Sequence, residues 1–226
     1  MSTSHLNHTQ QNTADAYELL LFDYATGNLD MPQSLIVMSH TMLNEGALNK
    51  VNAYETTGGM LLETQDQADI NPDSLDNIFA KIEATPADAK KVSDAAHISC
   101  SVLPEPIAQM TRKPVTDIQW KSVLPGIQKT DLPFSRNESF TELLKIDADK
   151  AVPSHSHGGQ EITLVLDGSF FEGDTEYKRG DLVVADGSVT HAPLAGSKGC
   201  VCITSRTAPL RFKGLFGNII NPFLKH

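Results

Sequence analysis

Residues 155–168 constrain the fold of this chain more than any other stretch. They read His-Ser-His-Gly-Gly-Gln-Glu and then Ile-Thr-Leu-Val-Leu-Asp-Gly, so after Glu161 isoleucine or leucine recurs at every second position. That alternation predicts a half-buried strand, which a tight turn at Gly168 closes. Side chains two apart on a strand point the same way, so we expect His155 and His157 to face one point.

A second strand-like segment supplies another histidine. Residues 181–185 read Asp-Leu-Val-Val-Ala, and His191 follows after an Asp-Gly-Ser turn. Three imidazole nitrogens and one carboxylate oxygen form a donor set that suits Zn, Fe, Mn, Ni or Cu. Taken alone, a His-x-His pair is more often a pair of surface residues in a polar turn. The full set predicts a metal site formed by His155, His157, Glu161 and His191.

The spacing of these residues resembles the two metal-binding motifs of cupins. The first motif, H-x-H-x(3)-E-x(6)-G, is matched at every position. The second motif, G-x(5)-P-x-G-x(2)-H-x(3)-N, keeps Gly180 and His191 but has Asp186, Ser188 and Ala195 at the Pro, Gly and Asn positions. The resemblance implies a jelly-roll barrel that keeps all four metal-ligand positions.

Length and composition indicate a soluble protein. The chain has 226 residues, of which 40% are apolar. Its apolar runs are too short to span a bilayer and its first residues lack a signal-peptide pattern, so we expect a cytoplasmic location. Cys100, Cys200 and Cys202 form no disulfide framework. Cys200 and Cys202 share a strand face and should pack as small hydrophobic residues, although the sequence leaves a redox role open.

The negative charge is concentrated in the N-terminal part. The formal net charge of the chain is −10, and residues 1–85 carry twelve acidic residues against two basic ones, whereas residues 86–226 carry sixteen of each. A surface of this sign disfavours direct binding of nucleic acid. It favours a protein partner with a basic surface.

The same N-terminal part has helical periodicity. Apolar residues recur at i, i+3, i+4 and i+7, as in Leu75, Ile78, Phe79 and Ile82, and the pattern predicts four helices. We expect a disordered start over residues 1–12. The helices should pack through the apolar residues Leu20, Leu21, Leu35, Leu43, Val51, Ile78 and Phe79.

The chain therefore reads as two domains of the α+β class. Residues 1–85 form a small helical domain, and residues 86–102, with little periodicity, read as a linker. From residue 103 short strand-like runs separated by Gly or Pro predict an all-β domain over residues 103–226, in which residues 118–121 form an early strand.

A helical domain followed by a single cupin resembles the ChrR family of anti-sigma factors. The residues that carry the resemblance are 15–29, Ser39-His40, 120–126 and 155–168, and it covers nearly the whole chain. It implies that the helical domain binds an ECF sigma factor and keeps it from RNA polymerase. It also implies that the cupin holds zinc and helps to release the sigma factor under stress such as singlet oxygen or peroxides.

The sequence departs from that family in its helical domain, which in the family also holds zinc. The family's ligands there are a histidine before the first helix and an H-x(3)-C-x(2)-C motif. His40 is kept, but Asn44 and Ala47 stand at the cysteine positions, and Asn12 aligns with the first histidine. We therefore expect no zinc in the helical domain, and we expect His40 in or near the core.

Two other functions stay open. Iron or manganese has room for further ligands beside this donor set, so a dioxygenase-like cupin enzyme is the main alternative. A small-ligand binding module whose helices mediate self-association is the other. We favour the anti-sigma factor, a regulator and not an enzyme, with an ECF sigma factor as partner. It should hold one divalent metal, zinc ahead of iron or manganese, and bind neither nucleic acid nor membrane, with homo-oligomers through the cupin left open.

Overall fold

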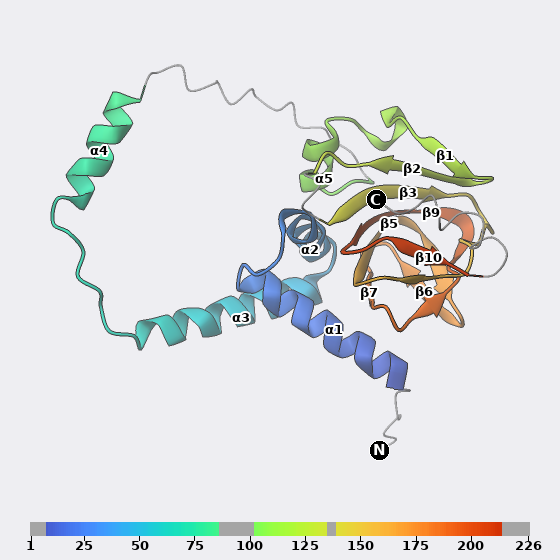
Figure 1. Ribbon diagram of the computed structural model, residues 1–226, viewed down its shortest axis with the longest axis horizontal. Helices are drawn as coiled ribbons and strands as arrows, with labels where there is room; N and C mark the ends of the chain where they lie inside the picture. The colour runs from blue at the N-terminus through green and yellow to red at the C-terminus, as the bar shows by residue number, and fades with distance from the viewer. Residues whose placement is uncertain (1–7, 86–101, 135–138, 214–226) are drawn as a thin grey trace.

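A computed structural model describes residues 8–85, 102–134 and 139–213 and shows helices followed by a barrel of strands (Figure 1). The helices are α1 (His8–Ala25), α2 (Met31–Leu43), α3 (Glu45–Glu63), α4 (Ser74–Ala84) and α5 (Glu105–Thr111), and a short 3-10 turn spans Val115–Asp117. Every strand follows in sequence after α5. This order confirms the predicted α+β class with helices first.

The strands form two antiparallel sheets. The larger sheet has the order β1 (Lys121–Leu124), β2 (Ile127–Asp131), β3 (Phe140–Ile146), β9 (Leu194–Arg206), β5 (Glu161–Glu172), β6 (Thr175–Lys178), and β7 (Leu182–Ala185) also pairs with β5. The smaller sheet has the order β10 (Leu210–Phe212), β4 (His155–His157), β8 (Thr190–His191). In this arrangement β4 lies at the centre of the smaller sheet, so both of its neighbours fix the direction of its side chains.

Capping residues set the limits of α2 and α3. The Asp30 side chain accepts a hydrogen bond from Gln33 N at 2.9 Å, which satisfies an otherwise free amide at the start of α2. Asn44 ends α2 and caps α3, where its side chain accepts from Ala47 N at 3.1 Å. The predicted break at Asn44 is confirmed.

Helices α1, α2 and α3 share one hydrophobic core with the barrel. Leu21 and Ile36 are fully buried in the same cluster as Leu143 and Ile162 of the barrel. Polar contacts join the two parts as well, because Asp30 Oδ2 accepts hydrogen bonds from the backbone nitrogen and the hydroxyl of Ser139, at 3.0 and 2.6 Å. These helices are therefore held by the barrel as well as by one another.

Helix α4 takes no part in that core, and the prediction that Ile78 and Phe79 pack with the other helices is wrong. Each of the two side chains is 54% exposed, and α4 has no buried residue. The other predicted core residues are buried or half-buried. They are Leu20, Leu21, Leu35, Leu43 and Val51. Helical periodicity shows that a helix has an apolar face, but it does not show what covers that face.

Three further expectations need correction. Helix α1 begins at His8, so residues 8–12 are helical where we predicted disorder. Helix α5 occupies the start of the predicted all-β domain, where Ile107 and Ala108 bury one face of a single short helix. The predicted strand at residues 118–121 begins only at Lys121. Of the predicted linker, only Val102 belongs to the described residues.

The predicted end of the central strand at Gly168 is also wrong. Strand β5 continues to Glu172, and its pairing with β9 shifts register on both sides of this glycine. Gly168 has a positive φ of 68°, and a Cβ atom at this position would overlap the backbone oxygen of Gly199. The glycine therefore permits an irregular crossing of β5 and β9 and does not close a turn.

Replacing Gly168 with alanine should lower the free energy of unfolding by about 3 kcal/mol, because the methyl group meets backbone that cannot move aside. Gly173→Ala is the matched control. Its φ is 56° but no atom lies within 4 Å of its added Cβ, so about 1 kcal/mol is expected. Urea denaturation of both variants measures the difference, and equal losses would contradict the close approach to Gly199.

Candidate metal centre

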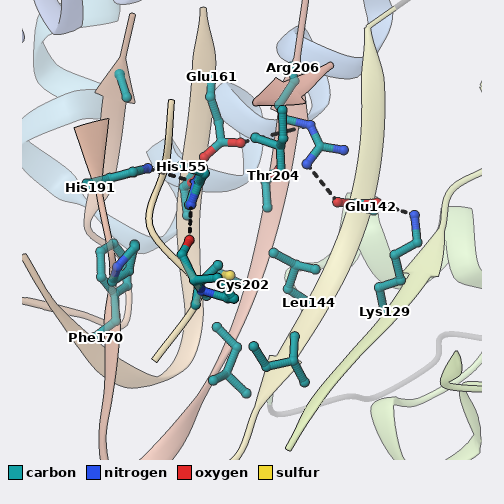
Figure 2. A pocket seen from close by; sticks show the side chains of 18 of the residues that line it. Lys129, Glu142, Leu144, His155, Glu161, Phe170, His191, Cys202, Thr204 and Arg206 are labelled. Carbon is teal, nitrogen blue, oxygen red and sulfur yellow. Dashed lines mark hydrogen bonds and ion pairs between the residues drawn. The ribbon is translucent and has the colours of Figure 1, made fainter. Parts of the chain in front are cut away.

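Strands β4, β5 and β8 bring the four predicted ligand residues together. Three of them, His155, Glu161 and His191, are labelled in Figure 2. Each of His155, His157, Glu161 and His191 offers a ligand atom, and these atoms all lie within 4.8 Å of one another. His155 and His191 are register partners in the pairing of β4 with β8, and Glu161 begins β5. As expected from their spacing, His155 and His157 point to the same side of β4.

The three imidazoles meet through their Nε2 atoms. His191 Nε2 lies 2.9 Å from His157 Nε2 and 3.0 Å from His155 Nε2. Two nitrogens that bind one ion, each about 2.1 Å from it, would be about 3.0 Å apart at the right angle of octahedral coordination and about 3.4 Å apart in a tetrahedron. His157 Nε2 either donates to His191 Nε2 or, in its other tautomer, turns a third lone pair toward the same point, and the second arrangement fits a metal ion.

Two of the imidazoles are oriented by hydrogen bonds through their other nitrogen. His155 Nδ1 lies 2.8 Å from Pro153 O, and His191 Nδ1 lies 2.5 Å from Glu172 Oε1. Carbonyl and carboxylate oxygens only accept, so both Nδ1 atoms donate, which leaves each Nε2 lone pair free for a metal. The sequence did not reveal Glu172, because its strand was predicted to end at Gly168.

Burial sets the protonation of the ligands. It lowers the pKa of His155 to about 4 and that of His157 to about 3, so both rings are neutral at neutral pH, as metal binding requires. Burial also raises the pKa of Glu161 to about 7, while the nearby positive charge of Arg206 acts in the opposite direction. A divalent ion would favour the ionised carboxylate further.

The metal-free protein should lose stability, on the order of 2 kcal/mol, as the pH falls from 6.5 to 4.5. In this window the unfolded chain protonates His155 and His157, whereas the folded chain keeps them neutral. Protonation of Glu161 stabilises the folded chain over the same range, because the pKa of its folded carboxyl group is about 7. The loss from the two histidines is larger than this gain from one glutamate. Urea denaturation after chelation measures the slope, and a stability that rises on acidification would contradict these protonation states.

A row of charged side chains, of which the two glutamates are buried, extends from the site across the barrel (Figure 2). Arg206 Nε lies 4.0 Å from Glu161 Oε2, and Arg206 Nη1 lies 2.9 Å from Glu142 Oε1. Lys129 Nζ in turn lies 2.7 Å from Glu142 Oε2. The sequence offered no signal for this row, since its members come from four strands, β2, β3, β5 and β9, whose pairing was unknown.

The two strand cysteines pack as predicted. Cys200 and Cys202 are each 3% exposed and belong to a buried cluster that includes Val165 and Phe170. The hydrogen bond with the neighbouring Cys200 thiol, together with burial, raises the pKa of Cys202. The Cys202 thiol is therefore held in the protonated, unreactive form.

His40 connects the helical part to the barrel. It is 1% exposed, which confirms its predicted place in the core, and its Nδ1 lies 2.8 Å from Gly180 O. Its Nε2 lies 2.8 Å from the Tyr17 hydroxyl. At two positions where the family has zinc ligands, this chain therefore has hydrogen bonds: those of His40 to Gly180 and Tyr17, and the Asn44 cap of α3. The absence of zinc here stays a prediction, and the side chain of Asn12 lies outside the described residues.

Comparison with known proteins identifies the family. The chain is 30% identical over 213 residues to the anti-sigma-E factor ChrR of Cereibacter sphaeroides, covering 92% of this chain and 96% of that protein. The chain belongs to the ChrR family. Residues 108–210 match a family described as the ChrR cupin-like domain. The crystal structure of Rhodobacter sphaeroides SigE in complex with the anti-sigma ChrR is also similar, with a TM-score of 0.69 and 28% identity, covering 84% of this chain and 96% of that chain.

Membership of the ChrR family confirms the resemblance and the cupin fold of the barrel. The relative is an anti-sigma factor, which is a regulator and not an enzyme, and this agrees with the function favoured from the sequence. In the described part of the chain, no helix combines the length and apolarity needed to cross a membrane.

Proposed function

We propose that this protein is an anti-sigma factor that sequesters an ECF sigma factor in the cytoplasm. The observation that carries the proposal is the similarity, over 84% of the chain, to a ChrR protein crystallised together with SigE. The proposed helical domain, residues 1–85, makes the contact, and the proposed cupin domain, residues 103–226, responds to the signal.

An uncovered apolar surface on α3 and α4 supports a protein partner. The end of α3 exposes 64% of Met60, 62% of Leu61 and 73% of Leu62. On α4 the exposed apolar side chains are Leu75, Ile78, Phe79 and Ile82. In Figure 1 α4 stands apart from the barrel beyond the end of α3. Apolar surface at this density on a soluble chain marks an interaction site.

Charge supports the kind of partner. The twelve acidic and two basic residues of the first 85 residues include Asp66, Asp69, Asp73 and Asp76, which lie before or within α4. A sigma factor must carry basic surface for DNA. An acidic, apolar surface is complementary to such a protein and would compete with DNA for it.

The cupin holds one divalent ion in this proposal, with zinc preferred over iron or manganese. Three imidazole nitrogens and one carboxylate oxygen are ligands that zinc accepts, and the ion would join β4, β5 and β8. When bound, the metal supplies positive charge that keeps Glu161 ionised. Release of the sigma factor under oxidative stress, such as singlet oxygen or peroxides, is proposed from the family resemblance.

Co-expression with the ECF sigma factors of the same organism, one at a time, tests the proposal. This chain and one of these sigma factors should co-purify through size exclusion as a stable complex, with about one metal ion per complex found by elemental analysis. A matched co-expression with the housekeeping sigma factor should give no complex. Recovery of the two chains in separate peaks for every ECF sigma factor, with each sigma factor folded and soluble, would overturn the proposal.

A further inference from the structure

A cavity of about 330 Å³ lies inside the barrel next to the candidate metal centre. Its polar lining includes His155, Glu161, His191, Thr204 and Arg206. Its apolar lining includes Ile127, Leu144, Ile146, Val152, Phe170 and Val183. Figure 2 shows Leu144 and Cys202 below Thr204, on the side away from Glu161. The volume is at the lower end of the range typical of small-molecule sites, and it equals about ten water molecules.

Two buried side-chain donors that line this cavity have no acceptor within hydrogen-bond distance, although Arg206 Nε lies 4.0 Å from Glu161 Oε2. In the part of the chain that the structure describes, the buried side-chain atoms without a hydrogen-bond partner include Thr204 Oγ1 and Arg206 Nε. Thr204 is only 2% exposed, and both residues line the cavity. A buried donor left unpaired is costly, on the order of 1–3 kcal/mol, so such groups usually have a partner that belongs to a ligand or an ordered water.

The charges that line the cavity favour an anion. Among the described residues these are the acidic Glu142, Glu161 and Glu172 and the basic Lys129 and Arg206. Three negative and two positive side chains together with one divalent ion leave a single positive charge. One carboxylate would neutralise it, whereas an amine would add a second unpaired positive charge.

We propose that this cavity binds a small aliphatic monocarboxylate, with its carboxylate between Thr204, Arg206 and the metal position and its hydrocarbon chain against Leu144, Ile146 and Phe170. The inference rests on the proposed metal binding of the cupin and extends it by naming the class of ligand. Strands β5 and β9 line the cavity and also contact α2. A ligand in the cavity would therefore contact the two strands on which α2 packs.

Calorimetric titration of the metal-loaded full-length protein with octanoate, butanoate and octylammonium tests the proposal. Octanoate should bind once per chain. It should bind at least tenfold more tightly than butanoate, because its longer hydrocarbon chain contacts more of the apolar lining. Octylammonium should give no binding heat. Absence of octanoate binding, or equal binding of octanoate and octylammonium, would overturn the assignment.

Thr204→Val supplies the residue-level test. It removes the unpartnered hydroxyl at constant shape, so octanoate affinity should fall at least tenfold while the unfolding midpoint in urea stays equal or rises. The matched control is Thr141→Val, whose buried hydroxyl donates to Ser139 O at 3.1 Å and lies 3.0 Å from Ser205 Oγ outside the cavity lining. It should lose stability and keep octanoate affinity. Unchanged affinity in Thr204→Val would overturn the assignment.

Metal content and sigma binding are recorded on the same preparation, which separates the two proposals. A chain that holds its metal and forms the sigma complex, yet binds no octanoate, overturns the cavity assignment alone. Octanoate binding by a chain that forms no sigma complex supports the cavity assignment and counts against the anti-sigma function.

Discussion

Full-length protein in which His155 and His157 are both replaced with alanine should contain no stoichiometric metal. The two rings supply the two nitrogens that lie within 3.0 Å of His191 Nε2, and Glu161 with His191 alone cannot complete a site. Elemental analysis after dialysis should find about one ion per chain in the parent protein and less than about a tenth of that in the variant.

His40→Gln is the matched control for this experiment. It removes a buried histidine that contacts Tyr17 and Gly180 but is not near the four ligands, so the metal content should stay at that of the parent. Full retention of metal by the His155 and His157 double variant would refute the site. A loss of one ion in His40→Gln would show that the helical part holds a metal after all.

The largest effect on sigma binding is expected from α4. Replacing Ile78 and Phe79 with aspartate should weaken binding to the ECF sigma factor more than about a hundredfold, because two apolar anchors are lost and charge is placed in the contact. The free energy of unfolding should change by less than about 0.5 kcal/mol, since α4 has no buried residue. Calorimetric titration and urea denaturation measure the two quantities.

The control for α4 adds the same charge on its opposite face. Asn77→Asp with Ala80→Asp introduces two aspartates on the same helix, away from the apolar face, and should keep sigma affinity within about tenfold of the parent. If both double variants bind the sigma factor like the parent protein, the apolar face of α4 is not the contact. If the Ile78 and Phe79 variant unfolds, α4 belongs to the core and its described exposure is wrong.

The ligand set was predictable because its spacing is tied to backbone geometry. A strand period of two aims His155 and His157 at one point, and the motif spacing adds Glu161 and His191. Glu172 and Arg206 escaped prediction for a different reason. Their roles depend on the continuation of β5 past Gly168 and on the pairing of the strands. The local periodicity of the sequence predicts neither.

The helical part shows the same limit. Its helices were predicted from their apolar period, and the caps Asp30 and Asn44 marked their ends. Periodicity could not show that α1–α3 would bury their faces on the barrel while Ile78 and Phe79 stayed exposed, because apolar residues read alike whatever covers them.

The most direct test of sequestration is run-off transcription with purified RNA polymerase and the ECF sigma factor. Addition of the full-length protein at a one-to-one ratio to the sigma factor should stop transcription from a promoter of that sigma factor. Transcription by the housekeeping sigma factor in the same mixture should continue unchanged. If transcription from the ECF promoter persists at several-fold molar excess of this protein, the proposed anti-sigma function is contradicted.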